Sequence, residues 1–245
     1  MHSPAQHSRV GHRFSASVAV LVLLGAFVPG GTVLAQSRNL APGFTSLPKG
    51  TKVVVMPVDL ELFSISAGGV LEPKADWTEE ALKHFKAALV ERERTLGVTA
   101  VELNEQDADE LAEVSALHAA VARAVALHHF GISSFRLPTK EGKLDWSLGE
   151  AVHPIKQKTG ADYALFSWVR DSYASGQRIA TIIALAALGV GVQGGTQTGY
   201  ASLVDLNTGQ VLWFNRLIRP RGDLREAAKA AETLNALLDN FPVAQ

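Results

Sequence analysis

The sequence contains no cysteine, and this absence excludes two kinds of covalent chemistry. Without cysteine the chain cannot form structural disulfides, and it cannot carry the lipidated cysteine of bacterial lipoproteins. Charge of one sign is also lacking, because 23 basic residues face 24 acidic ones and no segment is strongly basic. This balance argues against a nucleic-acid binder and against electrostatic attachment to anionic lipid. With 47% hydrophobic and 19% charged residues, the composition is that of a folded chain and not of a disordered one.

Motifs for catalysis and for dinucleotide binding are missing as well. No G-x-S-x-G motif occurs, and no serine stands beside a histidine or an acid in a recognised order, although a spatially assembled triad remains open. Gly189 to Gly194 matches G-x-G-x-x-G, but the downstream segment is typical of a strand and Asp205 comes too early for the ribose-binding acid. We therefore interpret this string as a Gly-rich turn and predict no catalytic residue and no cofactor.

Three histidines, His118, His128 and His129, lie on one predicted helix and raise the question of a metal site. At a rise of about 1.5 Å per residue, His118 and His129 are about 16 Å apart, and adjacent residues point about 100° apart around the axis. The spacing therefore predicts ordinary surface or rim histidines and no metal site.

The first 35 residues have the pattern of an export signal. Arg9 and Arg13 precede an apolar run from Val18 to Val28, and Val33 to Ala35 supply the small and aliphatic residues of a cleavage site. We predict a cleavable signal peptide over 1–35 and a protein of the periplasm that is not a lipoprotein.

The rest of the chain predicts a flexible lead over 36–50 and a single α/β domain over 51–245 with an insertion at 176–197. Short β-branched or alternating runs predict strands, and apolar residues at helical spacing predict helices. Capping boxes are predicted at Asp76 with Glu79 and at Asp223 with Glu226. The predicted strands are 52–59, 98–103, 162–170, 200–206 and 210–216, and the predicted helices are 76–97, 106–130, 146–158 and 223–238.

This order of elements indicates an α/β three-layer sandwich with a mixed sheet of about five strands, and a hydrophobic helical insertion before a C-terminal β-hairpin. The hairpin turns at Asn207 to Gly209. Phe166 and Trp213 lie in near-continuous apolar strands, so we expect both in the core of the sheet.

The insertion is apolar nearly all round from Ile179 to Val192. As a helix it is about 20 Å long, too short to cross about 30 Å of hydrocarbon. A buried helix, a partner-binding or assembly surface and a membrane-contacting element all remain open, and burial is the simplest of the three. The candidate contact residues for a partner or a second copy are Ile179, Ile183, Ala184, Ala187 and Gly191.

Three segments together resemble a known bacterial set. They are Lys52 to Val58, Thr159 to Ser167, and Ala201 to Trp213, whose sequences contain a first strand ending in Pro, "GADY" before a strand, and "D-x-x-T-G" before a Trp-bearing strand. They resemble the envelope superfamily of the curli-secretion lipoprotein, the amino-terminal domain of the Tol propeller protein, and the lipoprotein activators of peptidoglycan synthases. The resemblance implies a three-layer α/β domain that works through protein contacts and supplies no catalytic residues.

The predicted function is thus that of an exported, non-enzymatic envelope assembly or accessory factor that acts by protein binding or self-association. Its expected partner is another envelope protein or a second copy, with no nucleic acid and no identified small-molecule substrate. Two alternatives stay open. One is a periplasmic hydrolase with a spatially assembled site, and the other is a membrane-associated oligomer that uses residues 179–192.

Overall fold

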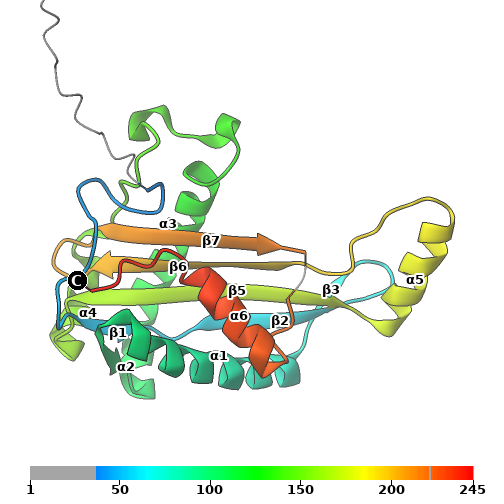
Figure 1. Ribbon diagram of the computed structural model, residues 1–245, viewed down its shortest axis with the longest axis horizontal. Helices are drawn as coiled ribbons and strands as arrows, with labels where there is room; N and C mark the ends of the chain where they lie inside the picture. The colour runs from blue at the N-terminus through cyan, green and yellow to red at the C-terminus, as the bar shows by residue number, and fades with distance from the viewer. Residues whose placement is uncertain (1–36, 221, 245) are drawn as a thin grey trace, which may run out of the picture. The chain divides into compact units, whose positions relative to one another are not determined.

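The computed structural model describes residues 37–220 and 222–244, and the longest strand, β5 (Tyr163–Ala174), organises the sheet (Figure 1). One edge of β5 pairs in parallel with two short strands, first β1 (Lys52–Val55) and then β2 (Asp59–Ile65). The other edge pairs antiparallel with β6 (Gln197–Asp205), and β6 pairs antiparallel with β7 (Val211–Arg219).

Two further short strands complete this sheet. The strand β4 (Thr99–Glu102) lies parallel to β1, and β3 (Leu71–Pro73) lies antiparallel to β2. The sheet is mixed, as predicted, but it has seven strands. β2 and β3 were not predicted, and Pro57 does not end the strand pairing along β5 but only interrupts it between β1 and β2.

A β-bulge around Pro57 explains how β1 and β2 share one edge of β5. Val55 lies opposite Leu165, and Asp59 lies opposite Trp168. The chain therefore advances four residues from β1 to β2 while β5 advances three, so the β1–β2 side has one extra residue. Proline has no N–H to donate to the ladder, which is why it is tolerated at such an irregularity. The extra residue reverses the alternation of side chains between the two faces. Val53 and Leu60 therefore share one hydrophobic core although one position is odd and the other even.

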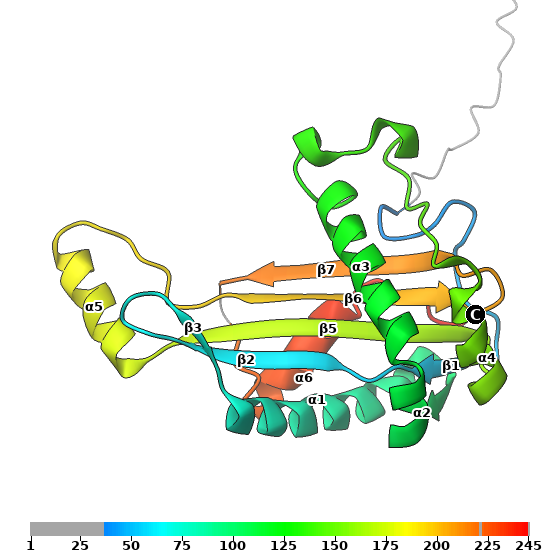
Figure 2. The same cartoon turned by 180° about the vertical axis from the view of Figure 1, so that it is seen from behind.

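Helices cover both faces of the sheet, so the predicted three-layer α/β fold is confirmed. α1 (Ala75–Leu96) and α6 (Ala227–Leu237) cover one face, and α3 (Ala112–His128) crosses the other (Figures 1 and 2). The core under α1 and α6 contains Phe85, and the core under α3 contains Val125, both fully buried. Each helix places an apolar stripe on the sheet, and in α3 the buried stripe also contains His118.

Several predicted helix boundaries are corrected. The predicted helix 106–130 is divided at Leu111 into α2 (Glu105–Glu110) and α3, and α2 is capped by the side chain of Asn104. The predicted helix 146–158 consists of a 3₁₀ turn, η3 (Gly149–Val152), and α4 (His153–Thr159), in which Pro154 occupies the first turn, where a proline costs no hydrogen bond. Two more 3₁₀ turns, η1 (Ser133–Phe135) and η2 (Pro138–Lys140), lie between α3 and η3.

Both predicted capping boxes are wrong. The N-cap of α1 is Lys74 and that of α6 is Glu226, and neither has a side-chain capping bond. Asp223 instead forms an ion pair with Arg225. The motif identified the start of each helix to within a few residues, but Asp76 lies inside the first turn of α1 and Asp223 is paired with Arg225.

The predicted C-terminal hairpin is confirmed as β6 and β7. Gly209 closes its turn with a φ of 73°, in the left-handed region that glycine adopts readily. Phe166 is 4% exposed and Trp213 is fully buried, so both lie in the core as predicted.

The segment predicted as a flexible lead, 36–50, needs correction over its described part, residues 37–50. Leu40 forms a β-bridge with Trp213, and the side-chain amide of Asn39 donates to the Phe214 carbonyl at 2.9 Å. Ala41 and Leu47 are buried. The predicted signal peptide lies outside the described residues.

Among the helices of residues 37–220 and 222–244, none is both long and apolar enough to cross a bilayer.

Candidate functional site

The predicted hydrophobic insertion forms an extension from the end of the sheet. β5 leads into the helix α5 (Gly176–Ala187), and a loop over residues 188–196 returns the chain to β6, beside the turn between β2 and β3 (Figure 2). Ser175 caps the helix by accepting the N–H of Arg178 at 3.1 Å. The Arg178 guanidinium donates to the Ala67 carbonyl at 3.1 Å and so ties α5 to the β2–β3 turn.

No residue of α5 is buried, so the interpretation of this segment as a buried helix is wrong. Ile179 is 50% exposed and Ile183 66%, and the small residues Ala184 and Ala187 are exposed as well. Gly191, the fifth predicted contact residue, is exposed in the return loop, because the helix ends at Ala187. A sequence that is apolar all round suggested burial, but the helix projects beyond the layers that could have covered it.

Only one side of α5 has intramolecular contacts. Ile182 and Leu185 are half-buried, and the Ile182 side chain lies close to Gly194 of the return loop. The outer side presents Ile179 and Ile183, and Leu188, just after the helix, is 78% exposed. We name these three large side chains, with the small residues Ala184 and Ala187 between them, the α5 surface.

A buried polar network lies at the base of this extension. Asp171 and Gln197 are opposite each other at the last pair of β5 and β6, and the Gln197 amide donates to the Asp171 carboxylate at 2.6 Å. The Tyr173 hydroxyl donates to the same carboxylate at 2.5 Å. Burial raises the pKa of Asp171, although these hydrogen bonds act in the opposite direction.

The network continues into β7 and α6. Arg219 donates to the Gln197 side-chain carbonyl at 2.7 Å and to the Thr233 hydroxyl at 2.5 Å. Gln197 and Thr233 are fully buried, so each polar group depends on the others for its hydrogen bonds. These bonds fix the position of the strands from which α5 projects.

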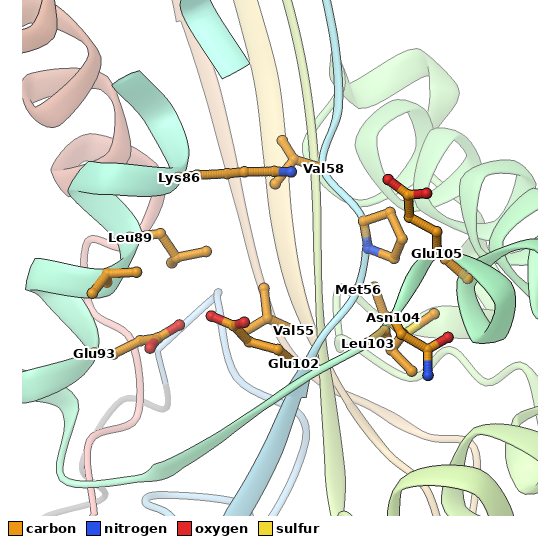
Figure 3. A pocket seen from close by; sticks show the side chains of 13 residues that line it. Val55, Met56, Val58, Lys86, Leu89, Glu93, Glu102, Leu103, Asn104 and Glu105 are labelled. Carbon is orange, nitrogen blue, oxygen red and sulfur yellow. The ribbon is translucent and has the colours of Figure 1, made fainter. Parts of the chain in front are cut away.

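A separate pocket opens at the carboxyl ends of the parallel strands β1 and β4 (Figure 3). It has a volume of about 290 Å³, and its apolar lining includes Val55, Met56, Leu89 and Leu103. Leu89, Lys86 and Glu93 project into it from α1, on the side opposite Glu102 of β4 (Figure 3).

Acidic side chains dominate the charge of this pocket. Burial, together with the charge of Glu102, raises the pKa of Glu93, and Glu105 adds a third carboxylate. Lys86 is the basic residue of the lining, and its ammonium forms no ion pair with a described residue. The pocket combines an apolar floor with more carboxylates than basic groups in its lining.

The structure brings one serine and one histidine together on the other face of the sheet. His118 Nε2 and Ser202 Oγ are 2.6 Å apart, and the His118 ring stacks on Phe166 with the ring centroids 3.8 Å apart. Burial lowers the pKa of His118 to about 3. An imidazole that resists protonation this strongly is a poor general base, and Ser202 is only 1% exposed, so the pair is suited to packing and not to nucleophilic catalysis.

The prediction of surface or rim histidines is therefore wrong for two of the three residues. His118 is 4% exposed and His129 is 6% exposed, whereas His128 is half-buried. Within residues 37–220 and 222–244, no three His, Asp or Glu side chains are grouped so that they could hold a metal ion. The Gly189 to Gly194 string follows a helix and precedes a strand, which is the reverse of the dinucleotide-binding order.

Sequence reasoning missed the polar network and the His118–Ser202 pair. Asp171 and Gln197 stand 26 positions apart, and no short motif links them. The sequence contains one signal for this pair: Asp171 and Gln197 lie at the two ends of the insertion. A polar residue buried in a strand there needs a hydrogen-bond partner on the neighbouring strand.

A mixed seven-stranded sheet between two helical layers, with an exposed apolar extension, defines a three-layer α/β domain with a projecting apolar helix. No protein-family model matches the sequence, and no curated protein is similar to it at a significant level. The similarities found are to solved structures.

The chain is similar to the PelC dodecamer of Paraburkholderia phytofirmans, at 15% identity over 84% of this chain and 95% of that chain, with a TM-score of 0.40. It is also similar to the C-terminal domain of LpoB from Salmonella enterica, at 16% identity over 74% of this chain and 88% of that chain, with a TM-score of 0.30. A third similar structure is the lipoprotein GNA1162 of Neisseria meningitidis, at 14% identity over 78% of this chain and 94% of that chain, with a TM-score of 0.30.

All three likenesses lie below 25% identity and have TM-scores below 0.5, so the resemblance to the envelope superfamily stays a prediction from the sequence. At these identities the likeness concerns the fold. The expectation of a periplasmic protein that is not a lipoprotein stays a prediction, because the predicted cleavage site lies outside the described residues.

Proposed function

We propose that the protein is an exported envelope accessory factor that works without catalysis, by protein contact through the α5 surface. The observation that carries this proposal is the exposure of the α5 surface, in which Ile179, Ile183 and Leu188 are each at least half exposed. A surface of this kind is typical of a binding site, because a contiguous apolar patch favours a partner that removes it from water. Full burial of one such side chain stabilises a complex by about 1.5–3 kcal/mol.

The composition of the extension supports a second copy of the chain as the occupant. Between Ile179 and Gln197 there is no Asp, Glu, Lys or Arg, so the surface complements an equally apolar one. Ala180, Ala184 and Ala187 follow the spacing of small residues that lets two helices approach closely. A two-fold pair of α5 helices would place the same patch on both sides of the contact.

Membrane contact is the alternative occupant, and the composition of α5 disfavours it. Interfacial helices usually combine an apolar face with several lysines or arginines that contact lipid headgroups. Arg178 is the single basic residue of α5, and its guanidinium already donates a hydrogen bond to the Ala67 carbonyl. Self-association therefore explains the exposed apolar side chains better than membrane contact, because it does not require the basic residues that α5 lacks.

The test is sedimentation equilibrium of the wild-type protein and of Ala184→Asp over a concentration series. We expect the wild-type protein to self-associate and Ala184→Asp to remain monomeric with an unchanged melting temperature, since α5 is not part of the core. Ile132→Asp is a matched control, because Ile132 has the same exposure as Ile183, 66%, on a different part of the surface.

Two results would overturn the proposal. One is a wild-type protein that stays monomeric at the highest concentration and binds lipid vesicles through α5. The other is an Ala184→Asp variant that unfolds, because that result would place α5 in the core.

A further inference from the structure

A small basic pocket lies where the end of α3 meets the loop 131–147 and the first described segment, 37–50, which Figure 2 shows next to each other beyond β7. The pocket has a volume of about 190 Å³. Its lining comes from three separate parts of the chain and consists of Arg38, His128, His129, Arg136, Leu137, Lys140, Gly142 and Trp146.

The guanidinium groups at this pocket have no acidic partner among the described residues. Arg38 donates to the His129 carbonyl and lies over the Phe130 ring, 4.9 Å from its centroid. The Arg136 backbone N–H donates to the Ser133 carbonyl at 3.2 Å, but its guanidinium forms no hydrogen bond and no ion pair with a residue in the described ranges. Arg216, close enough to influence Arg38, donates to the Ala126 carbonyl at 3.0 Å.

One carboxylate does lie near the rim. Lys140 Nζ is 3.5 Å from a carboxylate oxygen of Asp145, and the same ammonium lies 5.1 Å from the centroid of the Trp146 ring. This ion pair neutralises Lys140 and leaves the charges of Arg38 and Arg136 unbalanced.

Two titratable groups at the pocket have lowered pKa values, with burial as the largest cause and neighbouring positive charge as a further one. Burial, followed by the charges of Arg136 and Arg216, lowers the pKa of Arg38. Burial also lowers the pKa of His129, and the charges of Arg38 and Arg136 contribute in the same direction. Like charges held together without a counter-charge destabilise the fold, and a bound anion would remove that repulsion.

We propose that this pocket binds a phosphate group, with Arg38 and Arg136 as its principal donors. A guanidinium presents two parallel N–H groups that match two phosphate oxygens, and a phosphate carries up to two negative charges against two arginines. The pocket is smaller than the roughly 300–1,000 Å³ of sites for drug-sized ligands, so it fits a phosphate with a few attached atoms. The phosphate can belong to a small soluble ester or to a phospholipid headgroup.

The first experiment is a titration of the ¹⁵N-labelled protein with inorganic phosphate, in which sodium chloride keeps the ionic strength constant and amide shifts report binding. We expect saturable shifts confined to the segments around Arg38 and from His128 to Trp146. Arg136→Ala should weaken phosphate binding about tenfold, the effect of losing one charge-assisted contact, and Arg136→Lys should recover only part of it.

The matched control is Arg123→Ala, which removes the same charge from an exposed site on α3 outside the pocket. We expect it to change phosphate binding less than twofold. In chloride alone, Arg136→Ala should keep or raise the melting temperature, because Arg136 has no bond to lose and its removal relieves Arg38. If Arg123→Ala weakens phosphate binding as much as Arg136→Ala does, the effect comes from the net charge of the protein and not from the pocket, and the proposal is overturned.

A second pair of measurements distinguishes the two sources of the phosphate. Glucose 1-phosphate is titrated in the same way, and cosedimentation is measured with vesicles of phosphatidylglycerol and of phosphatidylcholine. Arg136-dependent binding of the sugar phosphate supports a soluble ester, and Arg136-dependent binding to the anionic vesicles alone supports a headgroup. If neither these probes nor inorganic phosphate perturb the pocket, the site does not exist.

Discussion

Replacing His118 by glutamine should remove most of the acid sensitivity that this residue gives to the fold. His118 is 4% exposed between α3 and the sheet, and burial lowers its pKa from 6.5 to about 3. A base whose pKa falls on folding stabilises the native state fully above its unfolded pKa, and this contribution is lost as pH falls from 6.5 toward 3.

The magnitude follows from this shift. Each pH unit below 6.5 costs about 1.4 kcal/mol while the folded state stays unprotonated, so a change from pH 7 to pH 4.5 costs about 2.5 kcal/mol. Glutamine does not titrate and retains an amide that can hydrogen-bond Ser202. Its absolute stability will be lower because the stacking on Phe166 is lost, so the pH dependence of stability is the quantity to compare.

The assay is urea unfolding of the wild-type protein, His118→Gln and His153→Gln at pH 7 and at pH 4.5. His153 is a matched control because it is another helix histidine but is not buried. Between the two pH values the wild-type protein and His153→Gln should lose about 2.5 kcal/mol more unfolding free energy than His118→Gln. Equal losses in all three proteins would refute the reasoning, because they would mean that His118 is solvated or already charged in the native state.

Two further predictions concern stability. Trp213→Ala should lower the unfolding free energy by about 3–5 kcal/mol in a urea melt, because a fully buried indole that contacts Phe241 is removed, and a melt like that of the wild-type protein would show the strand to be misassigned. Asp171→Asn should become more stable relative to the wild-type protein as pH rises above 3.8, because burial raises the pKa of Asp171 and its ionisation on the way to neutral pH then costs folding free energy. Unfolding free energies at pH 3.5 and pH 7 measure this difference, and a constant difference would contradict it.

Local patterns were sufficient for most of the fold. β-branched runs located β1, β4, β5 and the C-terminal hairpin, and the 3.6-residue period located α1 and α6 to within a few residues. These signals depend on neighbours a few positions apart, which the sequence displays directly. They failed at Pro57, because a proline that ends a strand and one that sits in a bulge have the same local appearance.

The candidate site was predicted in part. The sequence identified the five residues of the insertion and their apolar character, but it favoured burial, and α5 is exposed. Whether an apolar helix is covered depends on where the other layers end, and no periodicity within 179–192 contains that information.

The sequence by itself determined the absence of cysteine chemistry, the mixed α/β class and the positions of most strands and helices. Only the tertiary structure decided which charges and polar groups meet. Asp171 lies beside Gln197, His118 beside Ser202, and Arg38 near Arg136, each pair separated by at least 26 positions. Burial and electrostatic fields arise from side chains that the folded sheet and helices bring together, so a sequence without a basic run can still form a basic pocket.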